Sequence, residues 1–163
     1  MGTGSTDIRE RIAAAWGAAW QRGEVDVLDT VLADGYRRHG RTAQGAADLK
    51  ANITACRAGF PDLVTVIEDC VVEGDRVATR WVSRGTHTGR LMDVPPTGRT
   101  VTVSGATFSR IEDGMVAEEW VTWDPRQLLT ALGIIPLDSA RAEAPAQAAA
   151  EAQGRHARSV VAS

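Results

Sequence analysis

Acid–base chemistry is expected first at Asp124, which follows Trp123 at the end of a pattern typical of a strand. Counting back by two residues places Trp120 and Glu118 on the same strand face as Asp124. A carboxyl group beside an indole on a concave face loses solvation, and its pKa then rises toward values useful for proton transfer. Asp124 also precedes Pro125, so the alternative is that its side chain caps a following helix.

Two histidines are the next candidates for proton transfer. His87 lies in the sequence GTHTG and shares its strand face with Trp81, where an imidazole could move a proton or polarise a carbonyl. The alternative for His87 is a buried histidine whose hydrogen bonds serve only the fold. His39 follows two arginines in YRRHGRT, which favours either the rim of a site or simple exposure to solvent.

Several other kinds of site are not expected. Cys56 and Cys70 form no CxxC pair, and the histidines show no HxH or HExxH spacing, so we expect no metal. The sequence has no glycine-rich phosphate loop and no GxSxG elbow. Glu118 and Asp124 are separated by about 20 Å in an extended strand, too far for a glycosidase carboxylate pair.

The five tryptophans are unusual beside two phenylalanines and one tyrosine. Large rings in a chain of this size either fill the core or line a pocket for a flat, apolar ligand. The aromatic side chains that we expect to contact a ligand are Trp16, Trp20, Tyr36, Phe60, Trp81, Phe108 and Trp120.

The elements that position these side chains follow from hydrophobic spacing. Apolar residues at helical spacing, with breaks at glycine and proline, predict helices over about residues 5–23, 24–32 and 46–58. From Leu63 the period changes to two, which predicts strands at 63–73, 76–87, 101–111 and 115–124. Pro125 favours a last short helix over about 125–132.

Alternation along the second predicted strand separates two groups of side chains. Trp81 and the other odd-numbered residues face one way, and three arginines face the other, namely Arg76, Arg80 and Arg84. Three arginines on one face suggest an anion site, a solvated face or a contact between subunits, and the last two are favoured. We expect a homodimer or homotetramer, with Arg80, Val82 and Arg84 in the contact.

The order of elements predicts an α+β fold. Helices gathered on one side of a curved antiparallel sheet would cover an apolar cavity, and we expect the sheet to form a cone-shaped barrel. This domain is expected to span residues 1–136. Residues 137–163 are alanine-rich and poor in large apolar side chains, which predicts a tail without a stable fold.

Composition limits the classes of partner. The chain has 163 residues, 44% of them hydrophobic, and a net charge of -3, which is typical of one globular domain. Mild acidity argues against a nucleic-acid partner. No apolar run approaches the roughly 20 residues of a membrane span, and the N-terminus lacks the pattern of a secretory signal. We therefore expect a cytoplasmic protein that binds a small molecule and no membrane.

Six local patterns then occur in a fixed order: FPDL at 60–63, EGDRVATRW at 73–81, GTHTG at 85–89, PPTGRTV at 95–101, DGMVAEEWVTWD at 113–124 and LLTALGII at 128–135. Together they resemble the SnoaL-like polyketide cyclases. That family belongs to the superfamily of scytalone dehydratase, limonene epoxide hydrolase and nuclear transport factor two. The resemblance covers about residues 7–135.

The resemblance implies a barrel with a deep apolar cavity, an aromatic polyketide substrate, and ring closure by an intramolecular aldol reaction without metal or cofactor. It implies that Asp124 is the acid–base residue, and that His39 and His87 are pocket residues that assist it. The alternatives are a hydroxylase component, another ring-forming or water-adding enzyme of a natural-product pathway, and a member that binds a small ligand without chemistry.

Overall fold

The computed structural model describes residues 3–40, 44–91 and 93–135. Its first helix, α1 (Thr3–Gly17), continues as a short π-helical segment, η1 (Ala18–Arg22). Gly23 ends this segment with a φ of 77°, a left-handed backbone conformation that glycine adopts without strain. The first predicted helix is therefore confirmed, with a widened last turn.

The segment after Gly23 differs from the prediction. A short 3-10 helix, η2 (Val25–Thr30), stands where a helix over 24–32 was predicted. A strand that was not predicted, β1 (Leu32–His39), follows it. Asp34 and Gly35 interrupt the pattern of β1 and favour a turn. The strand that pairs with β1 is β5 (Met115–Trp123), which lies far along the chain. The local sequence therefore does not indicate β1.

The remaining elements lie close to their predicted positions. Helix α2 spans Ala46–Gly59, the strands β2, β3 and β4 span Val64–Glu73, Arg76–Thr86 and Thr100–Glu112, and helix α3 spans Pro125–Ala131. The turns that join β2 to β3 and β4 to β5 contain Gly74 and Gly114, both with positive φ. These elements are predictable because each carries its own local signal.

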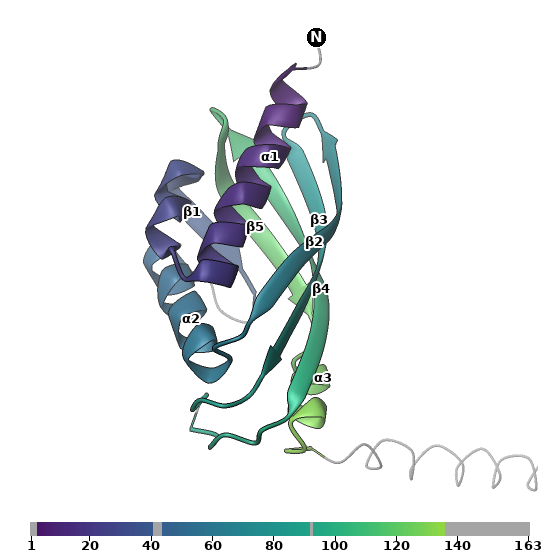
Figure 1. The fold of residues 1–163 in the computed structure, drawn as a ribbon. Coiled ribbons are helices and arrows are strands. Elements are labelled where there is room, and N and C mark those ends of the chain that lie inside the picture. Colours follow the sequence, from purple (N-terminus) through teal and green to yellow (C-terminus); the bar gives the residue numbers. More distant parts are fainter. Residues whose placement is uncertain (1–2, 41–43, 92, 136–163) are drawn as a thin grey trace, which may run out of the picture.

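The strands form one mixed sheet in the order β1-β5-β4-β3-β2. β1 runs parallel to β5, and the other neighbouring pairs are antiparallel. The sheet is bent, with β1 and β2 as its edges (Figure 1). The α+β class is confirmed, but the prediction of an antiparallel sheet closed into a barrel is wrong. Strand β1 adds a parallel pair, and the helices cover the bent face without a strand pairing that closes it.

The hydrophobic core lies between the helices and the sheet. One cluster joins α1, η2 and α2 to the sheet and includes Ile12, Leu28, Leu49, Ile53 and Val116. A second cluster near α3 includes Phe60, Leu91, Val101 and Leu128. Within the described residues, no helix is long and apolar enough to cross a membrane. The tail predicted at 137–163 lies outside the described residues.

Candidate functional site

A cavity of about 530 Å³ lies between the helices and the sheet. Its walls are largely apolar, and the aromatic side chains that line it are Trp16, Trp20, Phe60, Trp81 and Trp123. The indole of Trp81 lies over Gly105 of the neighbouring strand, where a Cβ atom would clash with the ring. Aromatic walls around a volume of this size suit a flat ligand of several rings.

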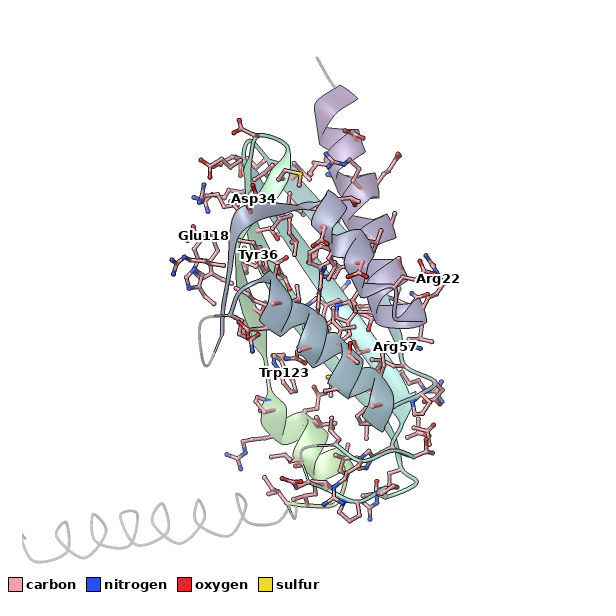
Figure 2. All side chains as sticks on the ribbon, turned by 90° about the vertical axis from the view of Figure 1, so that its left-hand side faces the viewer. Arg22, Asp34, Tyr36, Arg57, Glu118 and Trp123 are labelled. Carbon is pink, nitrogen blue, oxygen red and sulfur yellow. The ribbon has the colours of Figure 1, made fainter. Side chains whose placement is uncertain are left out.

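Four of the seven aromatic residues predicted to contact a ligand line this cavity, namely Trp16, Trp20, Phe60 and Trp81. Tyr36 is buried beside the cavity, where its side chain lies within the domain (Figure 2). Phe108 and Trp120 are 56% and 38% exposed and do not line the cavity, so their expected placement in the pocket is corrected.

The face assignment along β5 explains this correction. Glu119, Val121 and Trp123 line the cavity, whereas Glu118 and Trp120 alternate to the opposite face. Counting back from Asp124 in steps of two predicts that the even-numbered residues of β5, including Glu118 and Trp120, face the cavity. Trp123 was consequently not predicted as a lining residue.

Among the described residues that line the cavity, Glu119 is the only acidic one. Its side chain is 2% exposed. The Tyr36 hydroxyl donates a hydrogen bond of 2.6 Å to Glu119 Oε2, and the Ser109 hydroxyl donates one of 3.2 Å to Oε1. Burial raises the pKa of Glu119, while the charge of Arg38 and the two hydrogen bonds oppose that rise. A buried carboxyl group of this kind can accept a proton from a ligand and return it in a later step.

Tyr36 and Arg38 reach this region from β1, next to Glu119 on β5. Burial, followed by the nearby Glu119 carboxylate, raises the pKa of Tyr36 far above its usual range, so the phenol stays a neutral donor. Arg38 lines the cavity, and its Nη1 atom is buried without a hydrogen-bond partner among the described residues. Glu119 and Arg38 were not predicted as site residues, and Tyr36 was predicted there without the strand that carries it.

Asp124 is exposed and does not line the cavity. Its Oδ1 atom accepts a hydrogen bond of 2.9 Å from the backbone N–H of Arg126, and Pro125 begins α3 directly after it. The helix-cap alternative therefore describes its contacts, and its expected place on the concave face is corrected. The catalytic role that the resemblance implies for Asp124 stays a prediction.

His87 is fully buried but does not line the cavity. The backbone N–H of Thr97 donates to Nδ1 at 3.3 Å, and the Thr97 hydroxyl lies 3.1 Å from the same atom. Because Nδ1 accepts, we assign the ring proton to Nε2, which has no partner among the described residues. The ring packs on Phe60, with 5.2 Å between centroids. His87 thus anchors the segment before β4, and its assisting role stays a prediction.

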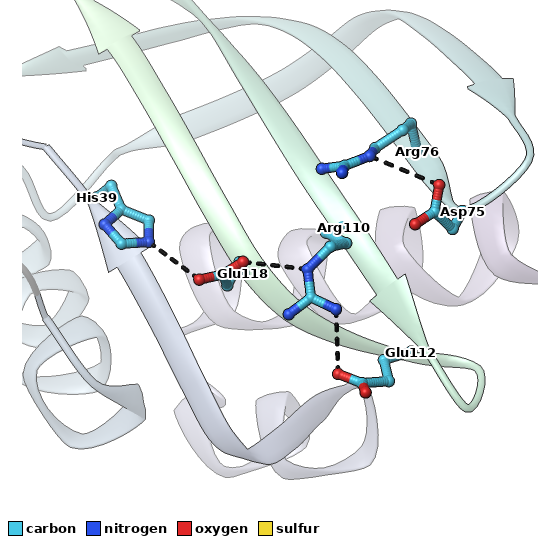
Figure 3. A network of polar contacts seen from close by, with 6 residues as sticks. All are labelled: His39, Asp75, Arg76, Arg110, Glu112 and Glu118. Carbon is cyan, nitrogen blue, oxygen red and sulfur yellow. Dashed lines mark hydrogen bonds and ion pairs between the residues drawn. The ribbon is translucent and has the colours of Figure 1, made fainter.

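His39 belongs to a polar network on the face of the sheet turned away from the helices (Figure 3). Its ring stacks on Trp120 with 5.2 Å between centroids, and Nε2 lies 3.4 Å from Glu118 Oε1. Arg110 contacts the other Glu118 oxygen at 3.0 Å, and Arg110 and His39 lower the pKa of that carboxyl. His39 is therefore remote from the cavity lining, and its role in a pocket stays a prediction.

No group of three histidine, cysteine, aspartate or glutamate side chains is placed to hold a metal ion in the part of the chain that the structure describes. Both cysteines are free thiols. Cys56 lines the cavity and donates a hydrogen bond of 3.3 Å to Asn52 Oδ1, and burial raises the pKa of its thiol. It is therefore a neutral wall residue.

Comparison with known proteins gives one family. The model of the SnoaL-like polyketide cyclases matches residues 10–132. No curated protein gives a significant match.

Among solved structures, AclR, a candidate hydroxylase from Streptomyces galilaeus, is 28% identical with a TM-score of 0.77, covering 93% of this chain and 98% of that chain. IdmH, a candidate polyketide cyclase from Streptomyces antibioticus, is 31% identical with a TM-score of 0.68, covering 77% and 98%. A candidate SnoaL-like polyketide cyclase from Jannaschia sp. CCS1 is 29% identical with a TM-score of 0.73, covering 83% and 98%.

Proposed function

Since this chain belongs to the SnoaL-like polyketide cyclase family, we propose that it is a cofactor-independent cyclase that closes a ring of an aromatic polyketide by an intramolecular aldol reaction. The observation that carries the proposal is the buried carboxyl group of Glu119 inside an apolar cavity of about 530 Å³. A raised pKa suits one carboxyl group to both proton transfers of an aldol reaction.

In the first step, the Glu119 carboxylate removes a proton from a carbon between two carbonyl groups of the substrate. The enolate carbon then attacks a ketone carbon, forming a C–C bond as the C=O π bond breaks. The resulting alkoxide takes the proton back from Glu119. Protons and electrons balance within the substrate and Glu119, so the reaction consumes no other reagent.

The surrounding residues support this chemistry by position. The hydrogen bonds from Tyr36 and Ser109 fix the Glu119 carboxyl group against the wall of the cavity. The indoles of Trp16, Trp20 and Trp81 stack with flat rings and exclude water from the enolate. Holding the enolate and the ketone in contact lowers the entropic part of the activation barrier, as in other intramolecular reactions.

Asp124 is the alternative acid–base residue under the same proposal, with His87 and His39 as assisting groups. The resemblance supports this assignment, and Trp123, the residue before Asp124, lines the cavity. We prefer Glu119 because its carboxyl group is buried in the cavity wall, whereas Asp124 is exposed and caps α3.

The experiment is anaerobic turnover of a tricyclic anthraquinone methyl ester with a β-keto side chain, without added cofactor. Ring closure by the wild type that is lost in Glu119→Gln and kept in Asp124→Asn supports the proposal. Loss in Asp124→Asn alone transfers the acid–base role to Asp124. If the wild type and both variants bind the ester tightly but none of them closes the ring, the protein is a ligand-binding protein and the cyclase proposal is overturned.

A hydroxylase component is the second candidate function. The similarity to AclR, described as a candidate hydroxylase, supports it because it extends over 93% of this chain. The same assay separates the two functions, since a hydroxylation requires oxygen and a reductant. Turnover that begins only when both are supplied favours the second candidate.

We also propose that the protein is a homodimer or homotetramer whose contact uses the sheet face away from the helices. This outer face carries the exposed side chains of Val64, Val66, Val71, Phe108 and Trp120. Arg80, Val82 and Arg84 lie on the same face of β3. Apolar side chains mixed with arginines are typical of contacts between proteins. A cytoplasmic location stays a prediction.

A further inference from the structure

Arg38 is a half-buried cation in the cavity wall, and one nitrogen of its guanidinium group is fully buried. It lines the cavity from β1, and its Nη1 atom has no hydrogen-bond partner among the residues that the structure describes. A guanidinium group stays charged at any physiological pH. Folding a chain with an unpaired buried donor costs free energy, so such an atom calls for a functional explanation.

Glu119 is the neighbouring acid, yet its hydrogen bonds go elsewhere. Tyr36 donates to one carboxyl oxygen and Ser109 to the other. Burial raises the pKa of Glu119 and the charge of Arg38 opposes that rise, so the two groups interact without a hydrogen bond between them. When Glu119 is protonated, the positive charge of Arg38 has no counter-charge in the described wall of the cavity.

The other titratable groups near Arg38 do not supply that counter-charge. Cys56 reaches the cavity from α2, and burial raises the pKa of its thiol. Tyr36, on β1, has a strongly raised pKa and remains a phenol. The wall around Arg38 is therefore neutral apart from Glu119.

Arg38 is also not needed to hold its own strand in place. Its backbone N–H donates a hydrogen bond of 2.8 Å to Gln44, and its carbonyl oxygen accepts one of 2.9 Å from the Gln44 N–H. The main chain is paired with β5 as well. The strand is thus fixed by backbone bonds, and the guanidinium group is left to serve the cavity.

We propose that Arg38 binds an anionic oxygen of the ligand, so that the cavity selects flat aromatic molecules that carry a carboxylate or an ionised enol. A guanidinium group pairs with such an oxygen through charge-assisted hydrogen bonds, and the apolar walls strengthen them. The inference rests on the proposed function for its catalytic consequence, which is that Arg38 stabilises the enolate oxygen formed when Glu119 removes a proton. The preference in binding stands on the cavity alone.

The test compares two matched pairs of probes by isothermal titration calorimetry. Anthraquinone-2-carboxylate is compared with anthraquinone-2-carboxamide, and 2-hydroxyanthraquinone with 2-methoxyanthraquinone at a pH where the hydroxyl group is ionised. The proteins are the wild type, Arg38→Met and Arg38→Lys. Arg9→Met is the control, because Arg9 is exposed on α1 and its loss changes the net charge equally.

The wild type is expected to bind the charged member of at least one pair about tenfold to a hundredfold more tightly, the range of a charge-assisted hydrogen bond. Arg38→Met should lose this preference, Arg38→Lys should keep part of it, and Arg9→Met should keep all of it. The pair that shows the preference identifies the kind of oxygen. Equal affinities within both pairs for the wild type, or a preference that survives Arg38→Met, overturn the proposal.

Thermal unfolding gives a second measurement. Because the buried Nη1 atom of Arg38 has no hydrogen-bond partner among the described residues, Arg38→Met should unfold at the same temperature as the wild type or above it. A large fall in Tm indicates a structural role and counts against the proposal. If the wild type prefers the charged probe but closes no ring, the role of Arg38 in binding is supported and the cyclase proposal is contradicted. If it closes the ring but shows no such preference, the cyclase proposal is supported and the role of Arg38 is contradicted.

Discussion

The phenol of Tyr36 donates a hydrogen bond of 2.6 Å to Oε2 of Glu119, from β1 to the neighbouring strand β5. This bond favours the ionised form of Glu119 and so opposes the rise in pKa that burial causes. Burial and this hydrogen bond therefore act on the pKa of Glu119 in opposite directions. The contact exists only because β1 pairs with β5 in parallel.

Tyr36→Phe should therefore raise the pKa of Glu119 further. Losing a hydrogen bond to a charged group costs about 1.5–3 kcal/mol, which corresponds to about one to two pH units. The acidic limb of the pH profile of kcat/KM for ring closure should move to higher pH by that amount. Ser109→Ala removes the longer hydrogen bond and should move the limb less. An unchanged limb in Tyr36→Phe would mean that Glu119 is not the base.

The paired variants Glu119→Gln and Asp124→Asn separate the two candidate bases. Glutamine keeps the size of Glu119 and an oxygen for Tyr36 but cannot exchange the proton, so turnover should fall by about 10²–10⁴-fold. Asparagine is an equally good helix cap, so Asp124→Asn should keep its turnover and its Tm. Rates of anaerobic ring closure, with circular dichroism to confirm folding, decide between them. The opposite pattern would establish the role that the resemblance implies for Asp124.

The fold could be predicted wherever an element carries its own signal. Pro125 marks the start of α3, and the turns at Gly74 and Gly114 separate strands with clear alternation. Strand β1 has no such signal, because Asp34 and Gly35 lie within it and its pairing partner comes much later in the chain. Whether the sheet closes also depends on contacts between distant edges, which local patterns do not encode.

The cavity could be predicted in part. Trp81 lines the cavity on the face of β3 that its alternation indicates, together with Thr79, Ser83 and Gly85. In β5, each face carries an acid and a tryptophan, so alternation alone does not decide between Glu118 with Trp120 and Glu119 with Trp123. The choice is made by the packing of β5 against the helices and by its register with β4. Arg38 was not predicted as a cavity residue because β1, the strand that carries it, was not predicted.

Glu119 also predicts how stability depends on pH. Burial raises its pKa in the folded protein, so the unfolded chain releases the proton at a lower pH than the folded protein does. This group's contribution to the free energy of unfolding therefore falls as pH rises from about 4.3, the ordinary glutamate pKa, until the folded pKa is passed. Glutamine does not titrate, so Glu119→Gln does not lose this contribution. Its free energy of unfolding, measured with urea, should therefore increase with pH relative to that of the wild type. If the difference in free energy of unfolding between Glu119→Gln and the wild type does not change with pH, the pKa of Glu119 is not raised in the folded protein.

His87 should prove more important for stability than for chemistry. His87→Ala removes a fully buried ring and leaves the Thr97 N–H without its acceptor, which should lower the free energy of unfolding by about 2–4 kcal/mol. Thr97→Val removes only the hydroxyl group and should cost less. Urea unfolding measures both, and turnover is then compared per folded molecule. Normal stability with lost turnover in His87→Ala would instead support the catalytic role expected from the sequence.

The outer face of the sheet predicts the effect of one charge on assembly. Phe108 is 56% exposed and lies among the apolar side chains of that face. Phe108→Glu would place a charge in the proposed contact between subunits, where it is costly to bury, so we expect this variant to be monomeric. Ala13→Glu, on an exposed position of α1, adds the same charge elsewhere and should leave the assembly intact. Light scattering after size-exclusion chromatography gives the masses. A monomeric wild type, or an assembly that persists in Phe108→Glu, would show that this face does not join subunits.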